Sequence, residues 1–104
     1  GDVAGAEAAY KNALKLVGTH RVTLTALATL LREQGRYDRS EEVLRTLQFH
    51  HPSAESYGDY GAILHINGKF DEAKRLYEKS LLLDPSNNVV KSNLRKLEQK
   101  IASM

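Results

Sequence analysis

The amino-acid sequence predicts an all-α protein in which antiparallel helix hairpins stack into a right-handed solenoid. Apolar residues recur at helical spacing, whereas strand-forming residues never alternate over a useful length. The same helix break returns 33 residues apart, at Gly35 and Gly68, and the prolines that follow, Pro52 and Pro85, have the same separation. Because one amphipathic helix cannot bury its apolar stripe alone, each hairpin must pack against its neighbours. We therefore expect about six helices, of which the last caps the array.

Residues 1–18 are predicted to form the second helix of a truncated repeat. Ala6, Tyr10 and Ala13 have the spacing of the inward-facing residues in the second helix of the last complete repeat. The first helix of this repeat is missing from the sequence, so the apolar stripe lacks its partner. One hypothesis for the stripe is self-association, in which two chains pair through it.

Residues 19–53 and 54–87 are predicted to form two complete repeats, with Gly35 and Gly68 as the breaks between their helices. In the first repeat the residues expected to face inward are Leu24, Leu27, Ala28, Leu31, Tyr37, Ser40, Leu44 and Leu47. In the second they are Tyr57, Tyr60, Gly61, Leu64, Phe70, Ala73, Tyr77 and Ser80.

The first helix of the second repeat carries a cap and an unusual glycine. Ser53 precedes the periodic segment, and a serine at this place accepts a hydrogen bond from a free backbone N–H of the first turn. Gly58 is expected to lie away from the packing stripe, where a glycine inside a helix costs about 1 kcal/mol relative to alanine.

Residues 88–104 are predicted to form the capping helix. Its apolar residues are Val90, Leu94, Leu97 and Ile101, and its other faces are charged. A polar outer surface is needed at the end of a solenoid, because the last apolar stripe would otherwise face water. We expect the natural end of the array to lie here or close by.

Composition and motifs argue against several classes of function. The sequence has no cysteine, no apolar run of about 18 residues and no signal-peptide pattern. Its net charge is +2, and no aromatic residues alternate with the basic ones, so we expect neither nucleic-acid binding nor membrane contact. His50 and His51 are adjacent and point apart on a helix, and no nucleophile motif or phosphate-binding loop is present. We expect no enzyme activity, metal or cofactor in this chain.

Surface recognition is the function that remains. In a solenoid of helix hairpins, the first helices of successive repeats line the concave side. The predicted groove residues are Thr25, Thr29, Arg32, Asp59, Ala62, His65, Ser92, Asn93 and Lys96. They are mostly small and polar, which suits an extended peptide held by hydrogen bonds, and Arg32 with Lys96 could hold an acidic group. We therefore expect a protein or peptide partner.

The residue sizes resemble those of the tetratricopeptide repeat, whose pattern is W-x2-L-G-x2-Y, then A-x3-F, then P. The matching positions are Tyr57, Tyr60, Gly61, Leu64, Ala73, Tyr77, Ser80 and Pro85. The resemblance implies a protein-binding solenoid. Some members bind a C-terminal carboxylate with lysine and asparagine at fixed positions. Here these positions hold Thr25, Thr29, Gly58 and Ala62, so this carboxylate clamp is absent.

A narrower resemblance covers mainly residues 57–98. The segments 64–69 (LHINGK) and 93–97 (NLRKL) resemble the C-terminal repeats of the transmembrane and tetratricopeptide repeat (TMTC) family of protein O-mannosyltransferases. The resemblance implies part of an endoplasmic reticulum membrane enzyme that uses a dolichol-linked mannose donor, with lumenal repeats that engage acceptors such as cadherins. No catalytic residue can be transferred to this chain. The alternative is a cytoplasmic adaptor of the same fold.

Overall fold

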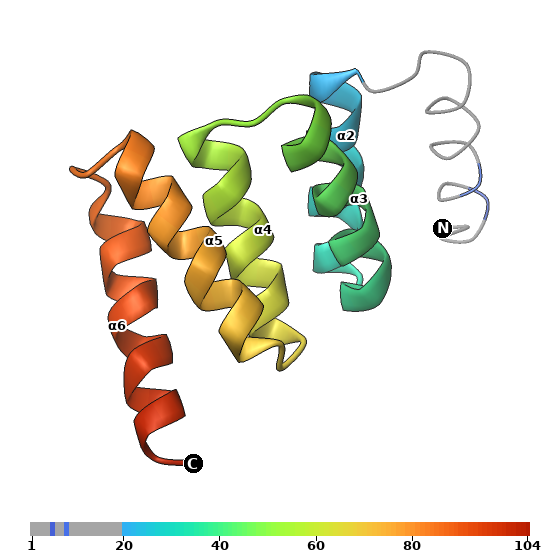
Figure 1. The fold of residues 1–104 in the computed structure, drawn as a ribbon. Coiled ribbons are helices and arrows are strands. Elements are labelled where there is room, and N and C mark those ends of the chain that lie inside the picture. The colour runs from blue at the N-terminus through green and yellow to red at the C-terminus, as the bar shows by residue number, and fades with distance from the viewer. Residues whose placement is uncertain (1–4, 6–7, 9–19) are drawn as a thin grey trace.

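The computed structural model describes Gly5, Ala8 and residues 20–104 (Figure 1). The predicted truncated repeat, with Ala6, Tyr10 and Ala13, lies outside these residues. Residues 20–104 contain five helices and no strand, which confirms the all-α class. The helices are α2 (Arg21–Glu33), α3 (Tyr37–His50), α4 (Ala54–Ile66), α5 (Phe70–Leu83) and α6 (Asn88–Ala102).

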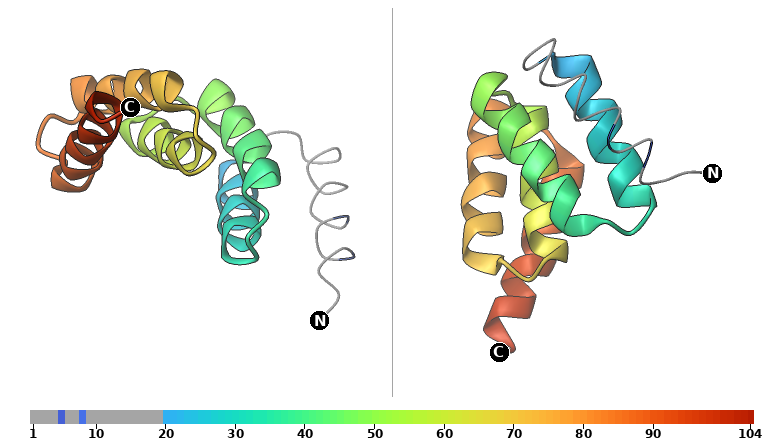
Figure 2. Two further views of the ribbon diagram at one scale, coloured as in Figure 1. Left: turned by 90° about the horizontal axis from the view of Figure 1, so that it is seen from below. Right: turned by 90° about the vertical axis from the view of Figure 1, so that its right-hand side faces the viewer.

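The helices pack as neighbours along the chain. α2 pairs with α3 and α4 pairs with α5, while α3 contacts α4 and α6 contacts both α5 and α4. Seen along the helices, α2, α4 and α6 lie on the inner side of an arc, and α3 and α5 lie on its outer side (Figure 2, left). The molecule measures 41 × 27 × 18 Å along its principal axes. This arrangement is the predicted solenoid, with the first helix of each hairpin on the concave side.

Glycine ends the first helix of each hairpin. Gly35 and Gly68 have φ angles of 74° and 77°, in the left-handed region that strains any other residue type. The residue after each glycine donates its N–H to a carbonyl five residues earlier, over 2.8 Å at Arg36 and 2.9 Å at Lys69. This is the hydrogen bond that closes a glycine-terminated helix, so the predicted breaks are confirmed.

The start of α4 is fixed by the predicted cap. The Ser53 hydroxyl accepts a hydrogen bond from the Ser56 N–H over 3.0 Å. In return, the Ser56 hydroxyl accepts one from the Ser53 N–H over 2.9 Å. Two free backbone donors are thereby satisfied, which fixes the first turn of the helix that lies at the centre of the concave face.

The predicted inward stripes form one core with a few differences. The buried apolar residues are Leu24, Leu27, Ala28, Leu31, Val43, Leu44, Leu47, Tyr60, Ile63, Leu64, Ala73, Leu76, Tyr77, Val90 and Leu97. Tyr37 was predicted to face inward but is 40% exposed, because it is the first residue of α3 and lies at the edge of the hairpin. Leu94 and Ile101 are only partly buried, since α6 packs on one side only within the described chain.

The prediction for Gly58 is wrong. Gly58 is buried, and a Cβ atom there would lie 3.1 Å from Val90 Cγ2 on α6 and 3.3 Å from Ser80 Oγ on α5. The sequence pattern describes how α4 packs on α5, whereas α6 packs against a second face of α4 that the pattern does not mark. The missing side chain lets α6 approach α4 closely.

We expect the two buried glycines of α4 to respond differently to alanine. A Cβ atom on Gly61 would lie 2.9 Å from Cδ1 of Tyr77, whose ring is buried and must shift to make space. Gly61→Ala should therefore destabilise the chain by about 1–2 kcal/mol, although alanine favours the helix by about 1 kcal/mol. Gly58→Ala should be closer to neutral, because its contacts of 3.1 Å and 3.3 Å require a shift of only a few tenths of an ångström. Urea denaturation followed by circular dichroism would measure both, and a Gly61→Ala variant as stable as the parent contradicts the packing described.

Candidate partner-binding groove

A hollow of about 250 Å³ lies between α2 and α4 on the concave face. Thr25, Thr29 and Arg32 from α2 and Asp59 and Ala62 from α4 all line it, together with Glu55 and the apolar residues beneath them. The structure thus brings five of the nine residues predicted for the groove into one hollow.

A second hollow, of about 610 Å³, lies between α4 and α6. Its lining includes Asn93 from α6, and it shares four residues with the first hollow: Arg32, Glu55, Asp59 and Ala62. The two hollows therefore adjoin along α4, and we call them together the groove. Ala62 and Asn93 also line a third hollow of about 390 Å³ with His65.

Two predicted residues lie outside these hollows. Ser92 is half-buried and Lys96 is exposed, and neither lines the hollows described above. Of the two basic residues predicted to hold an acidic group, only Arg32 lines the groove. The sequence analysis also missed Glu55, which lies one helical turn before Asp59 on the same face. The spacing of four residues between the two carboxylates was the available signal.

The carboxylates of the groove have few partners within the chain. The side chains of Glu55 and Asp59 make no hydrogen bond or ion pair with the described residues. Partial loss of water around its carboxylate raises the pKa of Asp59, and the negative charge of Glu55 raises it further, while Arg32 acts in the opposite direction. Asp59 is nevertheless an exposed residue. Asp59 therefore carries a negative charge that is only partly compensated.

His65 is held by aromatic rings. Its ring lies edge-on to Phe70 and Tyr77, with centroids 5.9 and 6.3 Å away. Its Nδ1 lies 3.5 Å from the hydroxyl of Tyr77. Burial lowers the pKa of His65, and the positive charge of Lys100 lowers it further. At neutral pH the ring is therefore uncharged, and it presents a neutral polar edge to the third hollow.

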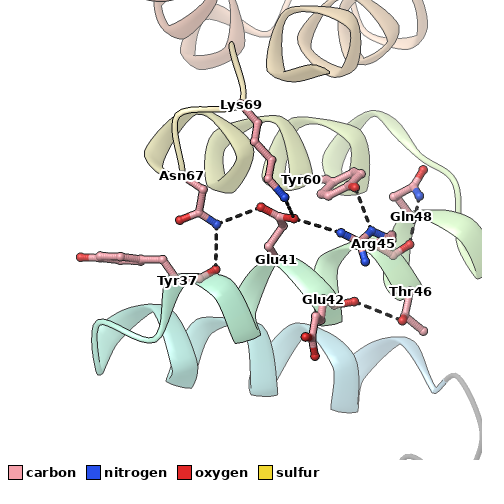
Figure 3. Close-up of polar contacts among 9 residues, drawn as sticks. All are labelled: Tyr37, Glu41, Glu42, Arg45, Thr46, Gln48, Tyr60, Asn67 and Lys69. Carbon is pink, nitrogen blue, oxygen red and sulfur yellow. Dashed lines mark hydrogen bonds and ion pairs between the residues drawn. The ribbon is translucent and has the colours of Figure 1, made fainter. Parts of the chain in front are cut away.

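A polar cluster behind the groove joins the two hairpins (Figure 3). The Glu41 side chain on α3 is 5% exposed and accepts hydrogen bonds from Lys69 Nζ over 2.6 Å and Asn67 Nδ2 over 2.9 Å. Arg45 Nη2 donates to the same carboxylate over 3.0 Å, and its Nε donates to the Tyr60 hydroxyl over 3.2 Å. These contacts fix α3 against α4 and the turn that follows it, which sets the spacing of the helices that line the groove.

The partners of Glu41 lower its pKa by more than its burial raises it. Burial alone would raise the pKa of Glu41, but the hydrogen bonds from Lys69 and Asn67 and the charges of Lys69 and Arg45 hold this pKa below its ordinary value. The sequence analysis did not single out Glu41, because two of its partners belong to the next repeat.

The described residues show no metal or membrane-spanning feature. No group of three or more histidine, aspartate or glutamate side chains in this part of the chain is placed to hold a metal ion. Within the same residues, no helix combines the length and apolar character needed to cross a bilayer.

Comparison with known proteins agrees with the geometry. The human protein O-mannosyl-transferase TMTC1 is 37% identical over 70 residues, which are 66% of this chain but only 8% of that protein. Among solved structures, the first tetratricopeptide repeat domain of Spaghetti (RPAP3), bound to the HSP90 peptide SRMEEVD, is 26% identical with a TM-score of 0.82. That likeness covers 93% of this chain and 78% of the other. The crystal structure of MamA has a TM-score of 0.86 at 22% identity, over 97% of this chain and 60% of the other, and shows the fold alone.

The similarity to TMTC1 confirms the narrower resemblance found in the sequence, and the RPAP3 domain confirms the solenoid. The tetratricopeptide repeat is a non-catalytic protein-interaction fold. Its family profile matches residues 25–88, which span both described hairpins. The chain therefore belongs to the tetratricopeptide repeat family.

Proposed function

We propose that this chain is an interaction module that holds an extended segment of a protein partner in the groove. The observation that carries the proposal is that the two hollows lined by α2, α4 and α6 adjoin along α4. Thr25, Thr29 and Asn93 offer side-chain hydrogen bonds along it, and Ala62 leaves room for a backbone to approach. The similar RPAP3 domain was solved with a bound peptide, which supports this use of the fold.

We further propose that the module is the lumenal part of an endoplasmic reticulum protein O-mannosyltransferase and engages its acceptor proteins. The similarity to human TMTC1 over 70 residues supports this context. In such a protein the chain would position the acceptor, and catalysis would belong to the membrane part. Cadherin-type acceptors are the partners that the resemblance implies.

The alternative is a cytoplasmic adaptor of the same fold. The fungal small glutamine-rich tetratricopeptide repeat-containing protein 2 is 25% identical over 98% of this chain, which spans 29% of that protein. An adaptor that works like the RPAP3 domain would bind the acidic peptide SRMEEVD. All four carboxylate-clamp positions line the groove, and none of them holds a basic side chain: they are Thr25, Thr29, Gly58 and Ala62. These positions favour the acceptor-binding role.

We expect Ala62→Arg to weaken binding of a purified cadherin ectodomain by about 10-fold or more, because a long side chain at the centre of the groove occupies the partner's space. Arginine favours a helix nearly as well as alanine does, and its charged end can reach solvent, so the fold should persist. Surface plasmon resonance with the immobilised 104-residue chain would measure the effect.

Leu82→Arg is the matched control. Leu82 is 81% exposed on α5 and lines none of the three hollows, so the same gain of one charge should leave binding unchanged. Equal binding by the parent and the Ala62→Arg variant would count against the groove. Binding of SRMEEVD in place of the cadherin ectodomain would favour the adaptor.

A further inference from the structure

The charges that line the groove have one dominant sign. In the hollow between α4 and α6, three carboxylates, Glu55, Asp59 and Asp84, face a single guanidinium, that of Arg32. The net formal charge of this lining is negative, although the whole chain has a net charge of +2. The groove therefore differs in sign from the average of the molecule.

The two carboxylates of α4 are not used to hold the fold together. Glu55 lies in the first turn of α4, where the helix dipole favours negative charge, but Asp59 lies beyond that turn. Neither carboxylate makes a hydrogen bond or ion pair within the described chain, whereas buried Glu41 has three such partners. Asp84 differs, because it accepts a hydrogen bond from the Ser86 hydroxyl over 2.7 Å.

The environment of Asp59 makes a cation favourable there. Its pKa is raised by the loss of water around it and by the neighbouring Glu55. A positive side chain of a partner would offset the cost of desolvating the Asp59 carboxylate and the repulsion between the two carboxylates. An acidic segment would add negative charge to the same place, which is costly where like charges are brought together.

We propose that the groove selects extended protein segments that carry lysine or arginine, with Glu55 and Asp59 pairing with the basic side chains. This inference rests on the proposed function and adds the chemical class of the partner. In an extended segment every second side chain points to the same face, so alternate basic residues can follow the carboxylates of α4 and reach toward α6.

The test compares two fluorescein-labelled nonapeptides, one alternating lysine with serine and one with glutamate in place of lysine. Fluorescence anisotropy with the 104-residue chain should show tighter binding of the lysine peptide by about 3- to 30-fold. The preference should shrink as the ionic strength rises from about 0.01 M, where screening acts over ~30 Å, to about 0.15 M, where it acts over ~8 Å.

Paired variants assign the preference to these carboxylates. Glu55→Gln combined with Asp59→Asn should remove most of the preference for the lysine peptide. The control, Glu78→Gln combined with Glu98→Gln, removes the same charge from exposed positions outside the hollows and should retain the preference. Thermal unfolding of both double variants should match that of the parent, because none of the four side chains is in the core.

The outcomes separate this inference from the proposed function. Equal binding of the two peptides, or tighter binding of the glutamate peptide, overturns the preference for basic segments. If the Ala62→Arg variant binds neither peptide in that case, the groove is still the binding site. No binding of the lysine peptide also overturns the inference, and the cadherin experiment then decides separately whether the groove binds a partner.

Discussion

Replacing Tyr77 with alanine is expected to lower the free energy of unfolding by about 3–5 kcal/mol. Tyr77 is 1% exposed and is the largest of the fully buried side chains. Its ring fills the space that Gly61 leaves open on α4, and it also supports the ring of His65. Removing it leaves a cavity at the centre of the second hairpin, because the helices cannot close over the lost volume. For a domain stabilised by about 5–15 kcal/mol in total, this loss is large.

Tyr77→Phe separates the ring from the hydroxyl. Burial raises the pKa of Tyr77 to about 12, so the hydroxyl is protonated at neutral pH, and its contact with His65 is long, at 3.5 Å. The phenylalanine variant should therefore lose no more than about 1 kcal/mol. Urea denaturation followed by far-ultraviolet circular dichroism measures both variants. An alanine variant within about 1 kcal/mol of the parent would be inconsistent with this core.

Replacing Glu41 with alanine is expected to destabilise the chain by about 2–3 kcal/mol, near the lower end of the effect of breaking a buried ion pair. Glu41 is the shared acceptor for Lys69, Asn67 and Arg45, and all three lose it together. Lys69 and Arg45 are about half exposed, so water can take over part of their solvation. Glu42→Ala is the control, since this neighbouring side chain is exposed and should change stability by no more than about 0.5 kcal/mol.

The same replacement should change how stability depends on pH. The pKa of Glu41 in the folded chain lies below its ordinary value of 4.5, so the unfolded chain binds more protons in the interval between the two values. The contribution of Glu41 is therefore complete above pH 4.5 and is lost as the pH falls through the folded pKa. The difference in stability between the parent and Glu41→Ala should shrink as the pH is lowered below 4.5. A constant difference across this interval would show that the charge of Glu41 contributes nothing.

The fold could be predicted from the sequence because its main determinants are local. The spacing of apolar residues gives the helix faces, Gly35 and Gly68 have positive φ angles that favour glycine, and Ser53 caps the helix it precedes. Each of these features depends on residues within a few positions of one another. The order of the packed helices then follows, because consecutive hairpins of this kind stack on their neighbours.

The features that were missed depend on contacts across repeats. Gly58 meets Val90, a residue of the following helix, and Glu41 meets Lys69 in the next hairpin. Neither contact is associated with a recurring spacing of residues in the sequence. The groove could be predicted in part. The spacing of residues on the helix faces identified Thr25 and Asp59 as groove residues. The negative charge of the lining could not be predicted, because it arises only where α4, α6 and the end of α5 come together.

The close approach of α6 to α4 at Gly58 bears on the width of the opening that a partner enters. Val90 rests against the bare backbone of Gly58, while Val89 and Asn93 of the same helix form one wall of the larger hollow. A side chain longer than that of alanine at position 58 would push this wall outward. The width of the opening therefore depends on the small size of residue 58, which itself lines the larger hollow.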